Sequence, residues 1–72
     1  MEHVLAKTIL TSQTIELIAQ NYRIGIEEAR ERFYNSKLPD LLDDDETGLY
    51  GESAWYLFSI YEEQMEKKID GN

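Results

Sequence analysis

The sequence predicts a small all-α fold, a bundle of three main helices plus one short helical turn. Apolar residues recur every three or four positions in three segments, and no segment keeps the period-two alternation of a strand. The chain has 72 residues, enough for one domain, and a chain of this size buries only about 60% of the surface that its unfolded form exposes. Its 42% hydrophobic and 31% charged residues are typical of a folded domain rather than of a disordered tail.

A first helix is expected over about residues 2–21. Its apolar side chains at helical spacing share one face, and these are Val4, Ile15, Ile18, Ala19 and Tyr22. Leu5 and Ile9 widen this face on one side. Leu10 and Leu17 fall on the opposite side, so we expect this helix to lie at the centre of the fold or to meet a partner chain.

A second helix is expected over about residues 26–36. Gly25 before it is a predicted turn or cap residue, and Glu27 and Glu28 in the first turn complement the helix dipole. The side chains predicted to share its core face are Ile26, Ala29 and Phe33. The helix should end near Ser36, before the chain reaches its only proline.

Two short segments follow. Residues 37–42 are predicted to form a helical turn with Pro39 among its first residues, where proline is well tolerated. The side chains expected to cover the core there are Leu38, Leu41 and Leu42. Residues 43–48 read as an exposed acidic loop, after which Leu49 and Tyr50 should fold back onto the domain.

The last helix is expected over about residues 53–68, with Ser53 as its N-cap. The residues predicted for its broad apolar face are Ala54, Trp55, Leu57, Phe58, Tyr61, Met65 and Ile69. We expect Trp55 and Phe58 to be largely buried, together with Phe33, and Ile18 to face them. Tyr56 and Ile60 lie on the other side of this helix.

The composition argues against several classes of protein. There is no cysteine, which excludes a disulfide framework and a cysteine-ligated zinc site. Fifteen acidic and seven basic residues give a net charge of −8, which disfavours nucleic acid and anionic membranes as partners. Because no signal peptide pattern and no run of about 20 apolar residues is present, we expect a cytoplasmic protein without membrane contact.

The acidic loop offers one alternative function, which is metal binding. Counted from Asp43, the loop satisfies positions 1, 3, 5 and 6 of an EF-hand, with Asp45, Thr47 and Gly48. Position 12, the bidentate glutamate of a true EF-hand, is Ala54, which cannot bind a metal ion. We therefore expect a solvated acidic turn and no bound metal.

A second alternative is a DNA-binding regulator. Residues 15–33 read as helix, short turn and helix, the arrangement of a helix-turn-helix unit. Its basic residues, which could meet phosphates, are Arg23, Arg30 and Arg32. Its acidic residues, which would repel phosphates, are interleaved with them at Glu27, Glu28 and Glu31. Surface pairs between arginines and glutamates three or four positions apart are the simpler interpretation.

Catalysis and cofactor binding have no support in the sequence. His3 is the only histidine and stands near a chain end, a poor position for a shielded general base. The paired carboxylates lie in a predicted loop rather than in a pocket. We therefore expect neither enzymatic activity nor a cofactor.

A protein-binding surface is the leading functional prediction. Three tyrosines are hard to bury together in so small a core, and tyrosine is favoured at interfaces. The residues predicted to form the interface are Leu10, Leu17, Tyr34, Tyr50, Tyr56 and Ile60. We expect the chain to form a homodimer or to bind another protein, which is basic if it meets the acidic second half. Residues 37–72 carry ten acids and three bases, whereas residues 1–36 carry five acids and four bases.

Several short motifs carry a resemblance. These are Phe33-Tyr34-x-Ser36, then Leu41-Leu42, then Glu46-Thr47-Gly48-Leu49-Tyr50-x-x-Ser53, then Tyr56 and Glu62-Glu63. In these motifs the sequence resembles a group of short uncharacterised bacterial proteins, mostly from Gram-positive species, to which no biochemical activity is assigned. The resemblance covers roughly residues 15–63. It implies an accessory protein, or one that acts like an antitoxin, and it supplies no functional residue.

Overall fold

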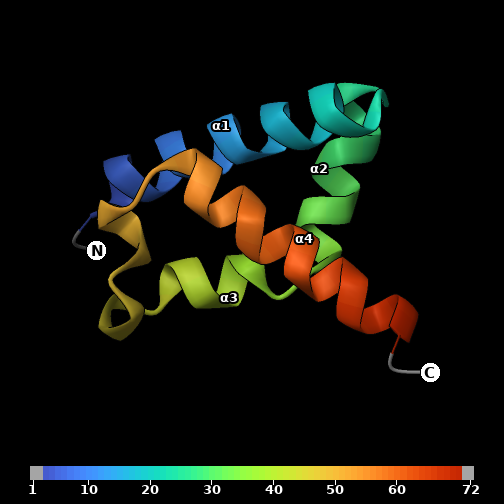
Figure 1. Ribbon diagram of the computed structural model, residues 1–72. Coiled ribbons are helices and arrows are strands. Elements are labelled where there is room, and N and C mark those ends of the chain that lie inside the picture. The colour runs from blue at the N-terminus through green and yellow to red at the C-terminus, as the bar shows by residue number, and fades with distance from the viewer. Residues whose placement is uncertain (1–2, 71–72) are drawn as a thin grey trace.

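The computed structural model describes the backbone of residues 3–70 and the side chains of residues 3–67. The helices are α1 (Val4–Tyr22), α2 (Ile26–Asn35), α3 (Leu38–Asp43) and α4 (Ala54–Asp70), with two short 3-10 helices, η1 (Asp45–Thr47) and η2 (Leu49–Gly51), between the last two. No strand occurs in this described part, so the all-α prediction is confirmed. Figure 1 shows α1, α2 and α3 as three sides of a frame, with α4 crossing one face of it.

The helix ends agree with the local signals in the sequence. Ser53 caps α4 as predicted, because its hydroxyl accepts a hydrogen bond from the Tyr56 N–H at 3.2 Å. Gly25 is a cap residue, as predicted. Arg23, not Gly25, takes the left-handed conformation after α1 (φ 56°), and Gly25 is the extended N-cap of α2. The predicted start at residue 2 lies outside the described residues.

One core forms where α1, α2, α3 and α4 meet. Its fully buried side chains include Ile18 of α1, Phe33 of α2, and Leu57 and Tyr61 of α4. Phe58 is buried as well, so the prediction for Phe33, Phe58 and Ile18 is confirmed. The remaining buried apolar residues are Leu10, Ile15, Ala29, Leu38, Leu42 and Leu49. Leu41, Tyr50, Ala54 and Met65 pack partly against this core.

The face predicted for α1 is confirmed at Ile15 and Ile18, which are buried, and at Ala19 and Tyr22, which pack partly against the core, but its N-terminal part differs. Leu10, placed on the outer side by the sequence pattern, is only 7% exposed, whereas Leu5 is 72% exposed and Val4 and Ile9 are also exposed. Leu10 and Leu17 lie beside the start of α4, so this second side of α1 is covered by α4.

Two further core predictions are wrong. Trp55, expected in the core, is 61% exposed and touches Phe58 only edge-on, with ring centroids 5.9 Å apart. Ile26 at the start of α2 is exposed too. Both stand at the first or second position of a helix, where a side chain has fewer neighbours than in the helix middle. Ile69 lies outside the residues whose side chains are described.

The acidic segment is an ordered turn rather than a loop. The Thr47 hydroxyl lies 2.8 Å from the carbonyl oxygens of Leu41 and Asp44 and accepts a hydrogen bond from the Leu49 N–H. Gly48 takes a positive φ of 70°, a conformation that glycine adopts without strain. These contacts order the backbone of the acidic segment, and Leu49 is buried in the core, as predicted.

Candidate functional site

Lys7 joins α1 to the acidic segment, a contact that the sequence analysis missed. Its ammonium group lies 2.6 Å from an Asp45 carboxylate oxygen and donates a hydrogen bond to the Asp43 carbonyl oxygen at 2.9 Å. The hydrogen bond with Asp45 raises the pKa of Lys7, and the same bond lowers the pKa of Asp45. Next to this pair the His3 ring stacks on Tyr50, with centroids 3.7 Å apart.

This contact bears on the metal-binding alternative. Two of the four residues that matched the EF-hand pattern, Asp43 and Asp45, face an ammonium group instead of an open coordination space. Among the described residues, no group of three acidic or histidine side chains is placed to hold a metal ion. The acidic turn therefore acts in this structure as the partner of Lys7.

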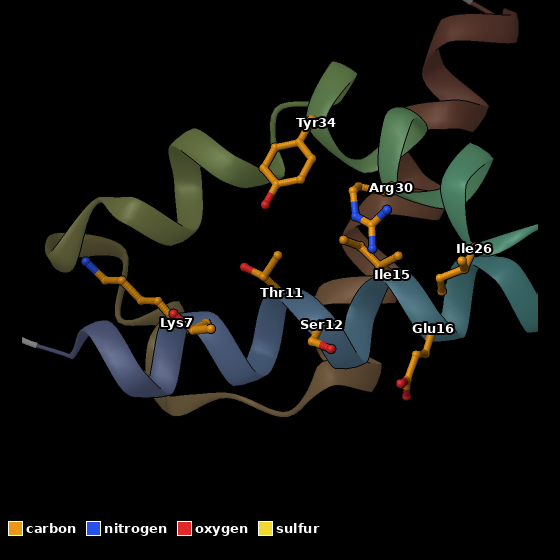
Figure 2. A pocket seen from close by; sticks show the side chains of 9 residues that line it. Lys7, Thr11, Ser12, Ile15, Glu16, Ile26, Arg30 and Tyr34 are labelled. Carbon is orange, nitrogen blue, oxygen red and sulfur yellow. The ribbon is translucent and has the colours of Figure 1, made fainter.

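A groove of about 480 Å³ runs between α1 and α2 (Figure 2). We call it the α1–α2 groove. Its side chains stand four residues apart along each helix and so project to the same side. From α1 they are Lys7, Thr8, Thr11, Ser12, Ile15 and Glu16, and from α2 they are Ile26, Arg30 and Tyr34. Figure 2 shows the Arg30 side chain reaching from α2 toward α1 and the Tyr34 hydroxyl turned toward Thr11.

A second surface lies on the other flank of α1. Trp55 borders a hollow between α1 and the start of α4, which Leu10, Gln13, Leu17 and Gln20 line from α1. Leu5, Ile9 and Gln13 follow one another at four-residue spacing, so the exposed Leu5 and Ile9 continue the same stripe. We define the tryptophan surface as Leu5, Ile9, Gln13, Leu17 and Trp55.

The six predicted interface residues do not form one patch. Leu10 is buried and Leu17 half-buried, and both line the hollow beside Trp55. Tyr34 is exposed but lines the α1–α2 groove, a different hollow. On α4, Tyr56 is exposed and Ile60 packs partly against the core, and Tyr50 is also half-buried. Leu10 is therefore a core residue, and an interface formed by these six residues stays a prediction.

The arginines of the predicted helix-turn-helix unit differ in their contacts. Arg32 pairs with Glu28 at 2.9 Å, as the spacing predicted, and lies over the Tyr22 ring at 5.8 Å from its centroid. Tyr22 in turn contacts Phe58 and Tyr61, so Arg32 is part of the packing between α1, α2 and α4. This leaves Arg30 as the arginine directed into the α1–α2 groove.

Comparison with protein-family models, with curated proteins and with solved structures found no match for this chain. The resemblance to short bacterial proteins therefore stays a prediction. Within the described residues, none of the helices has the length and apolar character needed to cross a bilayer. The fold and the two surfaces thus define a small acidic all-α domain, and any function has to be argued from its surface.

Proposed function

We propose that this chain is a small acidic protein-binding domain, an accessory rather than an enzyme, and that the tryptophan surface is its contact surface. The observation that carries this proposal is the exposure of Trp55, whose large apolar side chain is 61% exposed. Tryptophan is enriched among the residues that dominate binding energies. Leu5 and Ile9 extend the apolar surface next to it.

The charge of the domain favours a basic partner. Most of its fifteen acidic residues lie beyond α1, and the acids of residues 43–46 are exposed. Charge complementarity of this kind speeds association and selects against acidic proteins. Neutralisation of a basic partner, in the manner of an antitoxin, is the form of this function that we propose. The cytoplasmic location expected from the sequence stays a prediction.

A second copy of the chain is the alternative partner. Sedimentation equilibrium at micromolar concentrations separates the two cases, because a homodimer has twice the mass of 8.4 kDa. If the mass is that of one chain at every concentration, a different protein is the partner.

The contact surface is tested by capture from a native lysate with three baits: the parent chain, Trp55→Ala and Tyr56→Ala. Tyr56 is the matched control, since it is the neighbouring aromatic residue and is also exposed. We expect the captured protein, or the homodimer, to be lost with Trp55→Ala and kept with Tyr56→Ala. Equal capture by all three baits would show that the tryptophan surface is not the contact surface.

A further inference from the structure

Arg30 is a cation without an ion-pair partner among the described residues, on a chain whose net charge is −8. It stands on the same helix as Arg32, which has Glu28 as an ion-pair partner, but Arg30 forms no ion pair with any described residue. Its guanidinium group carries five N–H donors in a planar fork that matches a carboxylate. In the α1–α2 groove this fork reaches over Ile15 of α1 (Figure 2).

The hydroxyl groups of the groove are also without protein partners. Outside α1, the hydroxyls of Ser36, Thr47, Ser53 and Ser59 all form hydrogen bonds with the backbone. In the groove, the hydroxyls of Thr8, Thr11, Ser12 and Tyr34 form none with the described residues. Hydrogen-bond donors without a partner among the described residues are thus concentrated on the groove side of α1.

The other lining residues restrict the ligand. Ile26, which is exposed, offers apolar surface that suits an aliphatic side chain, and the nearly buried Ile15 lies at the base of the groove. Glu16 also lines the groove, and Glu27 and Glu31 border the adjoining hollow beside Arg30. These carboxylates repel a ligand with several negative charges, so phosphate-rich molecules fit poorly. A single carboxylate, carried on a neutral or basic segment, fits both the donors and the acids around them.

We propose that the α1–α2 groove binds a peptide segment that places one carboxylate on Arg30 and an apolar side chain on Ile26. The carboxylate accepts hydrogen bonds from the guanidinium group and from the hydroxyls around it. The proposal rests on the proposed function only in that the ligand is a protein. The groove and the tryptophan surface lie on different flanks of α1, so the two proposals can be tested separately. A basic residue next to the carboxylate would face the acids that border the groove.

The probe is a library of random twelve-residue peptides displayed on phage and selected on the full chain. Selected peptides are synthesised, and their dissociation constants are measured for the parent chain, Arg30→Ala and Arg23→Asn. Arg23 is the matched control, because it lies in the α1–α2 turn and its positive φ suits asparagine. A second peptide, with its acidic residue changed to the amide, completes a double-mutant cycle with Arg30.

We expect selected peptides to contain one acidic residue near an apolar one, and Arg30→Ala to weaken binding about tenfold to a hundredfold. Arg23→Asn should change it less than twofold, and the amide peptide should lose nothing further on Arg30→Ala. Amide chemical shifts should move at Thr11, Ser12 and Ile15.

Three outcomes would overturn the proposal: no peptide selected, peptides without an acidic residue, or binding that Arg30→Ala leaves unchanged. If binding is lost with Trp55→Ala and not with Arg30→Ala, the proposed function stands and the groove proposal fails. If Arg30→Ala weakens binding and Trp55→Ala, measured alongside it, does not, the groove is the peptide site, and the tryptophan surface is judged by the capture experiment alone.

Discussion

Replacing Thr14 by valine should stabilise the domain. Thr14 is fully buried in α1, and its hydroxyl oxygen has no hydrogen-bond partner. A buried polar group without a partner costs roughly 1–3 kcal/mol, and valine has the same shape with a methyl group in place of the hydroxyl. We therefore expect Thr14→Val to raise the free energy of unfolding by about 1–3 kcal/mol. For a domain of this size, each kcal/mol raises the melting temperature by roughly 4–8 °C.

Thermal and urea unfolding followed by circular dichroism measure this change. Thr8→Val is the matched control, since it makes the same substitution in the same helix at an exposed position, where we expect a change within about 0.5 kcal/mol. The urea slope should stay constant, which shows that the native state alone has changed. If Thr14→Val melts at or below the parent temperature, the hydroxyl has a partner, and the Leu10 carbonyl one turn earlier is the first candidate.

Three further predictions concern other positions. Phe58→Ala should lower the free energy of unfolding by about 3–5 kcal/mol and leave the chain mostly unfolded at 37 °C, whereas Trp55→Ala should keep the fold. Equal melting temperatures of these two variants would contradict this prediction. Leu10→Glu should abolish the helical circular dichroism signal, because it buries an unpaired charge. A folded Leu10→Glu chain would show that position 10 lies at the surface. The hydrogen bond from Lys7 lowers the pKa of Asp45. The stability that this pair contributes is therefore present above the ordinary carboxyl pKa of 3.8 and is lost as the pH falls through the lowered pKa. The stabilities of the parent and Asp45→Asn should therefore differ at pH 7 and converge in acid, and a difference that persists in acid would refute the role of this pair.

The helices could be predicted because their signals are local. The cap at Ser53, the early proline at Pro39 and the acids at the start of α2 each act within one helical turn. Such signals do not depend on what the rest of the chain does. Consequently the number of helices and most of their ends agree with the structure.

The buried surface of α1 could be predicted only in part, at Ile15 and Ile18, for the opposite reason. Apolar residues surround most of α1, so its own periodicity favours no single face. Only the position of α4 decides that Leu10 is buried and that Leu5 is exposed. The same holds for Trp55, whose neighbours along α4, Ala54 and Leu57, are the ones that turn toward the core.

The contacts of the candidate site are equally non-local. Lys7 and Asp43 are 36 positions apart, and nothing in the sequence links them except that Lys7 is the only basic residue of α1. The groove next to Lys7 depends on the angle between α1 and α2. A four-residue spacing of Ile26, Arg30 and Tyr34 is visible in the sequence, but the direction in which this row points is not.

The distribution of charge bears on how the proposed contact surface would meet a partner. α1 contains only two charged residues, Lys7, which is paired, and Glu16, which lines the hollow beside Trp55 together with Glu52. The tryptophan surface therefore has acids at its edge, and most of the other acids lie on α2, on the acidic turn and on α4. A partner that buries Trp55 there displaces water from few charges, while its own basic residues meet acids at the rim, as in interfaces with an apolar centre and a polar edge. The rim acids should then govern the association rate, and Trp55 the dissociation rate.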